Sequence, residues 1–263
     1  MLNFCSLYSG SSGNSLFVQS ENTKILIDIG VSAKKATLAL QSINIQPSDL
    51  DGILITHEHS DHVQGLSVFA RKYNIPIYVD NQTFDAIKET YKKGIDENLI
   101  CNITVNKKFL LNDLTIYPFE IPHDAINPCG YTITKGEKKI SIATDIGNMT
   151  EGILKHLENS CFVLLESNYD PEVLKCASYP YRLKCRIAGP TGHLSNETAG
   201  KTLSYLTRYG LTHAMLGHLS QECNFPELAY TTVMNELIST NNEKNFNLSV
   251  ASRFSCSKLI ELD

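Results

Sequence analysis

The sequence has no pair of cysteines at the Cys-x-x-Cys spacing, although it contains eight cysteines in 263 residues. Cysteines scattered in this way argue against a disulfide framework and against a thiolate zinc site. No segment approaches the roughly 20 consecutive apolar residues that a membrane-spanning helix needs. Residues 1–6 also lack the basic start and long apolar run of a signal peptide. The sequence therefore predicts a cytoplasmic protein with no membrane partner.

A strong excess of charge of either sign is also missing. The net charge is −5, with 19% charged and 42% hydrophobic residues, so the composition carries no global footprint of nucleic-acid binding. There is no Pro- or Ser-rich linker, no internal repeat and no low-complexity tract. We expect a single domain spanning residues 1–263. A homo-oligomer stays possible.

What the sequence does contain is a dense group of metal-binding side chains at residues 56–62, Thr-His-Glu-His-Ser-Asp-His, directly after a short apolar run. Neutral imidazoles and carboxylates are the ligands that bind zinc or manganese in proteins. His57 and His59 are two residues apart at a strand end, so both can face one ion. Asp61 and His62 follow at the start of a helix and could face a second ion. The segment predicts half of a dinuclear metal site.

Further ligands are expected at the ends of other apolar strands, where open sheets present their functional side chains. His123, Asp145 and His218 each follow such a strand. Asp145 could bridge two cations from its position. Asp28 closes another strand and could accept a hydrogen bond from a ligating imidazole, which fixes its tautomer. His193 lies just before a predicted helix, where it could have either a structural or a catalytic role.

Strand-like segments dominate both halves of the chain, and helices close each set. Strands and helices in this order predict two sheets packed face to face with helices outside, which is a four-layer αββα sandwich of the α/β class. We predict strands at residues 3–8, 15–19, 24–28, 53–55, 75–79, 114–120, 130–134, 139–143, 161–166, 214–217 and 247–251, and helices at 32–43, 196–209 and 226–239.

The pattern His-x-His-x-Asp-His after a strand, with an upstream Asp and a downstream His, Asp and His, resembles the metallo-β-lactamase fold superfamily. True β-lactamases usually carry Cys where Asp145 stands, so this chain is more similar to the glyoxalase and phosphodiesterase branches. Residues 192–195 and 216–220, Gly-His-Leu-Ser and Leu-Gly-His-Leu-Ser, are similar to the paired histidine motifs of tRNase Z. That likeness implies that His218 is the last metal ligand and that His193 is an acid beside the scissile phosphate.

A closer resemblance, to the YycJ/WalJ-type proteins, lies in residues 9–15, 123–125, 166–168 and 192–196. This chain differs from that branch at Tyr169, where the branch more often has His. The resemblance implies a bacterial, cytoplasmic DNA exonuclease that acts from the 5′ end. It also implies two divalent metal ions, Zn²⁺ or Mn²⁺, with iron possible.

The residues then give a chemical hypothesis. Two cations about 3.5–4 Å apart can bridge a hydroxide that attacks phosphorus in line. Asp61 could aim this hydroxide, and His193 could protonate the leaving 3′-oxygen. One ion would be held by His57, His59, His123 and Asp145, and the other by Asp61, His62, Asp145 and His218.

Substrate contacts are expected in two places. Residues 175–186 carry four cations and no acids, with two tyrosines between them, a combination that suits single-stranded nucleic acid. A solvated basic loop is the alternative interpretation. The backbone N–H groups of a glycine-rich turn at residues 10–13 could donate hydrogen bonds to a phosphate. The candidates for substrate binding are Ser12, Asn14, Tyr181, Arg182 and Lys184.

Two other functions remain open at this point. One is a thioester or lactone hydrolase of the glyoxalase type, which would share most of the ligands but would not need the basic stretch. The other is a metal-bound regulatory protein without catalytic activity. The complete set of candidate ligands favours an enzyme over the second alternative.

Overall fold

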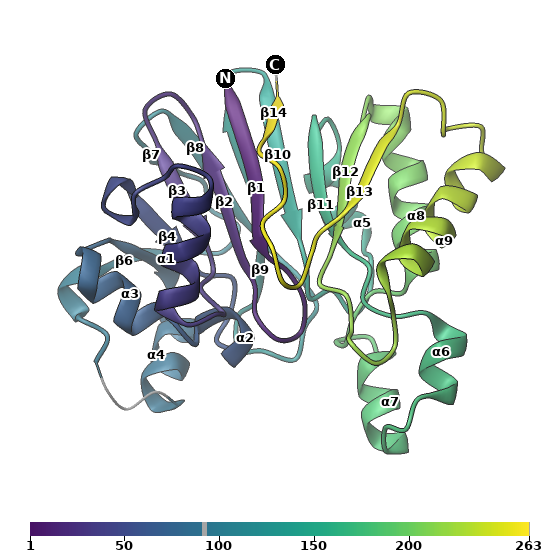
Figure 1. Ribbon diagram of the computed structural model, residues 1–263, viewed down its shortest axis with the longest axis horizontal. Coiled ribbons are helices and arrows are strands. Elements are labelled where there is room, and N and C mark those ends of the chain that lie inside the picture. The colour runs from purple at the N-terminus through teal and green to yellow at the C-terminus, as the bar shows by residue number, and fades with distance from the viewer. Residues whose placement is uncertain (91–93, 263) are drawn as a thin grey trace.

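The computed structural model describes residues 1–90 and 94–262 as two seven-stranded sheets that pack face to face, with helices on both outer sides (Figure 1). The first sheet has the order β14 (Ile260–Leu262), β1 (Leu2–Tyr8), β2 (Ser15–Gln19), β3 (Lys24–Ile27), β4 (Gly52–Leu54), β5 (Ile77–Asp80) and β6 (Ile100–Ile103). The second has the order β13 (Asn247–Val250), β12 (His213–Gly217), β11 (Phe162–Glu166), β10 (Lys138–Ala143), β9 (Cys129–Lys135), β8 (Leu114–Glu120) and β7 (Phe109–Leu111).

Helices cover the outer face of each sheet. The helices of the amino-terminal half are α1 (Ala33–Ser42), α2 (Ser60–Val63), α3 (Leu66–Tyr73) and α4 (Asn81–Thr90). Those of the carboxy-terminal half are α5 (Glu151–Leu157), α6 (Pro171–Cys176), α7 (Tyr181–Ile187), α8 (Asn196–Leu206) and α9 (Pro226–Ser239). Short 3₁₀ turns lie at Pro47–Asp49, Glu97–Leu99 and Thr207–Tyr209.

Three separate apolar clusters hold the layers together. One lies between the sheets, where the rings of Phe4 and Phe162 have centroids 4.6 Å apart. A second joins the first sheet to α1, α3 and α4, and the third joins the second sheet to α5, α8 and α9. Each sheet therefore buries both faces, which is why strands such as β4 and β11 consist almost entirely of apolar residues. The predicted four-layer αββα sandwich is confirmed.

Both sheets contain a run of parallel strands, β3 to β6 in the first and β10 to β13 in the second. The carboxyl ends of parallel strands share one edge of a sheet, and the loops that follow them meet there. In Figure 1 this is the lower edge, where α2, α6 and α7 lie. This edge carries the candidate site.

The structure also corrects parts of the sequence prediction. Strands β6, β7 and β14 and helix α4 were not predicted. The predicted helix at 196–209 ends as α-helix at Leu206 and continues as a 3₁₀ turn, whereas 226–239 matches α9. Residues 175–186, for which a solvated loop was the alternative, form the end of α6 and most of α7. Among the described residues, no helix is long and apolar enough to cross a membrane.

Candidate metal centre

The histidine-rich segment forms the turn between β4 and α2. The strand ends at Leu54, and Ile55 is still buried, so the residues that follow emerge from the sheet edge. His57 and His62 are both 0% exposed. Burial of two adjacent imidazoles at an edge otherwise open to loops is unusual for a surface turn and indicates a built polar site.

The second sheet supplies the opposing side chains. His123 follows β8, Asp145 follows β10 and His218 directly follows β12. His57, His59 and His123 have donor atoms close enough to share an ion, and so do Asp61, His62 and His218. The structure thus brings together all seven side chains predicted as ligands: His57, His59, Asp61, His62, His123, Asp145 and His218.

Asp145 lies between these two groups. Its carboxylate oxygens are 3.4 Å from Nε2 of His62, 3.7 Å from Nε2 of His123 and 3.4 Å from Nδ1 of His218. On the far side of the second group, Oδ2 of Asp61 is 3.4 Å from Nε2 of His218. A carboxylate in contact with both groups has the position that a bridging ligand requires.

Buried polar atoms without a hydrogen-bond partner test whether this site fits metal ions. Within the described part of the chain, the buried atoms without a hydrogen-bond partner include Nε2 of His57 and Oδ2 of Asp145. Leaving such atoms unpaired costs about 1–3 kcal/mol each, and a cation between them removes that cost. Imidazole and carboxylate donors in this number suit divalent zinc, manganese or iron.

Asp28 supports the first-sheet side of the site. Nδ1 of His62 donates to Oδ2 of Asp28 at 2.7 Å, and the backbone and hydroxyl of Thr56 donate to the same carboxylate at 2.9 and 2.8 Å. This fixes the tautomer of His62 so that Nε2 faces the centre, which is the arrangement expected for a ligating histidine.

Asn14, predicted to bind substrate, points into the centre. Its amide nitrogen lies 3.3 Å from Oδ2 of Asp61 and 3.1 Å from Nε2 of His62. Its amide oxygen accepts from the backbone N–H of Gly10 at 2.9 Å. Asn14 therefore positions Asp61, and its proposed contact with substrate stays a prediction.

Glu166 was missed as a site residue. It is completely buried at the end of β11. Oε1 accepts from Nδ1 of His193 at 2.8 Å and from Nδ1 of His218 at 2.7 Å, and Oε2 accepts from the backbone N–H groups of Ile146 and Leu194. One carboxylate thus orients both histidines. The signal that could have revealed it is the one that revealed Asp145, an acidic residue that ends an apolar strand.

The histidines of the centre fall into two groups, one with lowered pKa values and one with raised pKa values. Burial lowers the pKa of His57 well below its usual value, and burial also lowers the pKa of His123. For His218, burial is outweighed by Asp145, Asp61 and Glu166, which raise its pKa to about 10. The pKa of His62 is raised against burial in the same way, by three carboxylates.

The carboxyl groups show the complementary shifts. Burial alone would raise the pKa of Asp61, Asp145 and Glu166, but the facing histidines lower all three below their usual range. These shifts favour ionised carboxylates, and they favour the protonated forms of His62 and His218 as the balancing charges. A bound cation would replace these protons as the compensating charge.

Three site residues have a left-handed backbone conformation. Asp28, Asp145 and His218 have φ of 61°, 60° and 55°. Among the described residues, all other non-glycine residues at positive φ are asparagines. Non-glycine residues in this region cost energy and concentrate at functional sites. Here the conformation turns each side chain from its strand end into the centre.

Gly30 allows the loop after β3 to pack closely against the turn that carries Asp61. A Cβ at this position would lie 1.5 Å from the carbonyl oxygen of Asp61 and 2.7 Å from the amide nitrogen of Asn14. The backbone amide of Asn14 donates to the same carbonyl of Asp61 at 2.8 Å. Only glycine permits this packing of the loop after β3 against the metal-binding turn.

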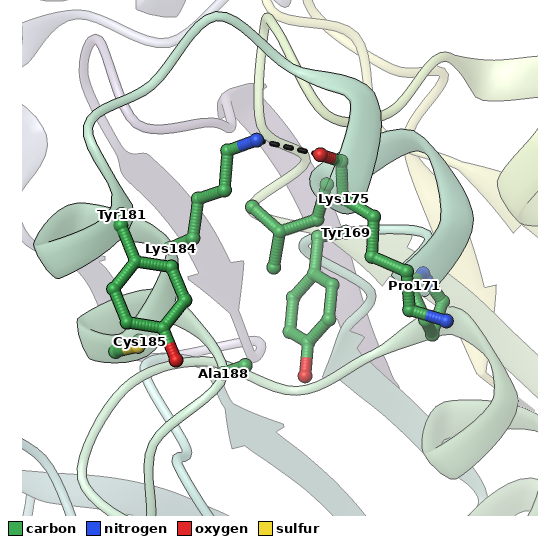
Figure 2. A pocket seen from close by; sticks show the side chains of 8 residues that line it. Tyr169, Pro171, Lys175, Tyr181, Lys184, Cys185 and Ala188 are labelled. Carbon is green, nitrogen blue, oxygen red and sulfur yellow. Dashed lines mark hydrogen bonds between the residues drawn. The ribbon is translucent and has the colours of Figure 1, made fainter.

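The remaining candidate residues lie around this centre. His193 is partly buried, and its Nδ1 lies 3.8 Å from Oδ1 of Asp145. The hydroxyl of Ser12 accepts from Arg253 at 2.9 Å. Tyr181 and Lys184 line a pocket beside α6 and α7 (Figure 2), whereas Arg182 is exposed and outside its lining.

Comparison with known proteins identifies the family to which this chain belongs. A family model described as the β-lactamase superfamily domain matches residues 23–219. The chain belongs to this superfamily. The resemblance to the metallo-β-lactamase superfamily expected from the histidine motif is thereby confirmed.

Two curated members of the superfamily are similar over most of the chain. The exodeoxyribonuclease WalJ of Streptococcus pneumoniae is 40% identical over 232 residues, which are 88% of this chain and 86% of that protein. The exodeoxyribonuclease YycJ of Bacillus anthracis is 34% identical over 258 residues, which are 95% of this chain and 93% of that protein.

Solved structures of superfamily members share the fold at low identity. The metallo-β-lactamase fold protein YhfI of Bacillus subtilis has a TM-score of 0.69 at 14% identity, with 98% of this chain and 100% of that chain covered. The short form of human tRNase Z has a TM-score of 0.65 at 15% identity, with 99% of each chain covered.

Proposed function

We propose that this protein is a metal-dependent exodeoxyribonuclease that removes nucleotides from the 5′ end of DNA. The observation that carries the proposal is the position of Asp145 between two groups of metal-binding side chains, with the Glu166–His193 pair beside it. The names of the two curated relatives support DNA as the substrate. A cytoplasmic location, predicted from the sequence, belongs to the same proposal.

In this proposal two divalent ions, Zn²⁺ or Mn²⁺, bind at the two groups. One is held by His57, His59, His123 and Asp145, and the other by Asp61, His62, Asp145 and His218. When bound, such a pair supplies a water of lowered pKa as nucleophile and neutralises charge on the phosphoryl oxygens.

The protein's own residues would orient the reaction. Asp61 is held by Asn14 and has a carboxylate oxygen directed toward the centre, so it can accept a hydrogen bond from the attacking water. His193 would act on the other side of phosphorus. Its Nδ1–H donates to Glu166, which leaves Nε2 to carry the proton that the leaving 3′-oxygen requires. The hydrogen bond to Glu166 keeps the ring in this orientation.

The deciding experiment incubates the purified protein with Mn²⁺ or Zn²⁺ and 5′-labelled single- or double-stranded DNA, beside a thioester substrate. We expect release of labelled mononucleotides and no thioester hydrolysis. Asp145→Asn keeps the shape and suits the left-handed backbone, and we expect it to abolish release. Asp85→Asn, an exposed change in α4, is the matched control. Thioester cleavage without nucleotide release would overturn the proposal in favour of the glyoxalase-type reaction.

A further inference from the structure

A pocket of about 380 Å³ lies beside α6 and α7, and none of its lining residues belongs to the metal centre (Figure 2). Its volume is within the range of small-molecule sites, roughly 300–1,000 Å³. The walls are mostly apolar, and the two largest side chains are tyrosines. The lining residues are Tyr169, Pro171, Leu174, Lys175, Tyr181, Lys184, Cys185 and Ala188.

The two tyrosines have different environments. Tyr169 is 9% exposed and forms a fixed wall, whereas Tyr181 at the start of α7 is 82% exposed. Both rings face the same space in Figure 2. A large aromatic ring left in solvent beside an apolar pocket is the kind of surface that a planar aromatic ligand covers.

The pocket is tied rigidly to His193. Tyr169 pairs as a bridge with Ser195, and the backbone N–H of Asn196 donates to the carbonyl of Tyr169 at 2.9 Å. From the other side, the N–H of His193 donates to the carbonyl of Ile187, the last residue of α7, at 2.9 Å. The same short segment therefore places both the candidate acid and the pocket wall.

Two cations lie beside the pocket without an ion-pair partner among the described residues. Residues 175–186 contain four cations, of which Lys175 pairs with Glu172 and Arg186 pairs with Asp124, so that Lys184 and Arg182 remain for a ligand. Nζ of Lys184 donates to the carbonyl of Lys175 at 2.6 Å, which joins α7 to α6 and keeps the ammonium at the pocket rim. Arg182 is exposed on the same helix. Aromatic faces for bases beside cations for phosphates are the two elements of single-strand recognition.

We propose that this pocket binds the base of the 5′-terminal nucleotide, with Tyr181 stacking on one face of the base. The inference rests on the proposed function. His193 is expected to serve the leaving 3′-oxygen, and that oxygen belongs to the terminal nucleotide. The pocket attached to His193 is thus placed to receive that nucleotide's base. Stacking on an aromatic ring accepts every base, so the pocket secures the strand end without selecting a sequence.

The test compares three single-stranded substrates: an intact one, one with an abasic residue at the 5′-terminal position, and one abasic at the second position. For the native protein we expect loss of the terminal base to raise KM about tenfold with little change in kcat, as base–aromatic stacking predicts. Loss of the second base should have a smaller effect. An effect confined to the second position would overturn the placement.

Tyr181→Ala should raise KM for the intact substrate and make the intact and terminal-abasic substrates equivalent. Tyr181→Phe keeps the ring and should behave like the native protein. Tyr230→Ala, an exposed tyrosine on α9, is the matched control. Since Tyr181 is so exposed, these changes should leave thermal stability and metal content unaltered. An intact-to-abasic ratio that is the same in the native protein and in Tyr181→Ala would overturn the inference.

A binding measurement separates this inference from the proposed function. A 5′-terminal 2-aminopurine in single-stranded DNA loses fluorescence when it stacks on an aromatic ring, and the chelator-treated protein can be used because no cleavage is needed. Quenching that disappears in Tyr181→Ala supports the pocket even if no metal gives nuclease activity. Quenching that is equal in both proteins, or absent from both, overturns the pocket even if DNA is cleaved.

Discussion

Oε1 of Glu166 lies 2.8 Å from Nδ1 of His193, and the carboxylate is completely buried. The pair connects the end of β11 to the segment before α8. Because Glu166 also accepts from His218, the same group orients a candidate metal ligand and the candidate acid. The first two predictions concern the two members of this pair.

Replacement Glu166→Gln should lower kcat for DNA about 10- to 100-fold, the usual effect of removing a partner that orients a ligand or acid. The amide keeps only one acceptor oxygen, so it can no longer accept from both the two backbone N–H groups and the two imidazoles that the carboxylate serves. Glu197→Gln, an exposed acid in the first turn of α8, is the matched control and should be neutral. Steady-state kinetics of the two variants give the comparison, and equal rates would contradict an orienting role.

Replacement His193→Ala should lower kcat about 10²- to 10⁴-fold, as expected for loss of a general acid, and should leave two metal ions per chain. The p-nitrophenyl ester of thymidine 5′-phosphate has a leaving group that needs no proton, so its hydrolysis should change much less. Elemental analysis measures the metal, and parallel assays measure both substrates. Loss of metal in this variant would show that His193 is a ligand instead.

Two replacements of Asp28 can separate its hydrogen bonds from its backbone conformation. Asp28→Asn tolerates φ of 61° but loses acceptor capacity toward Thr56 and His62, so metal affinity should fall about 10- to 100-fold. Asp28→Ala adds the cost of a left-handed alanine and should have a lower melting temperature than the Asn variant. Competition with a chelator and thermal unfolding measure the two effects. Equal melting temperatures would argue against backbone strain at this position.

Replacement Gly30→Ala should destabilise the protein by more than about 2 kcal/mol, since a Cβ would collide with backbone rather than with a flexible side chain. Metal affinity should fall with it, because Asp61 must move. Gly152→Ala in α5 is the control: the nearest atom lies 3.6 Å from the added Cβ, and helix propensity predicts a slight gain. Chemical denaturation of both variants tests the contrast.

Metal binding should release protons at pH 7. The pKa of His218 is raised to about 10 and that of His62 is also raised, so both are protonated in the metal-free protein, whereas ligation needs neutral imidazole. The apparent affinity should therefore increase as pH rises toward these pKa values. Calorimetry in buffers of different ionisation enthalpy measures the release, and we expect about one to two protons per chain. A binding enthalpy independent of the buffer would contradict it.

Sequence reasoning could select the candidate ligands because they follow one rule: each lies at or just after the end of an apolar strand. His123, Asp145 and His218 could be selected in this way. Glu166 obeys the same rule, yet it was noticed only as part of a family motif, because its role depends on two histidines that are distant in the sequence. The sequence predicted that Asp28 would accept a hydrogen bond from a ligating imidazole. Only the fold shows that this imidazole belongs to His62.

Most of the elements that escaped prediction, though not α4, share a physical cause. Strands β6, β7 and β14 are three or four residues long at or near sheet edges, and in such short elements partly exposed residues leave no clear alternation. Helices α6 and α7 have only six and seven residues; α6 starts at Pro171, and α7 starts directly after Pro180. Tertiary contacts rather than periodicity determine these elements.

The donors of the centre come from both sheets, with His57, His59 and His62 from the first and His123, Asp145 and His218 from the second. Ions held by such a set would also fasten the two halves of the sandwich together along their lower edge. Removing them with a chelator should then speed hydrogen exchange in the loops of that edge before it affects the opposite one. Catalysis and the attachment of the two sheets to each other would thus depend on the same few side chains.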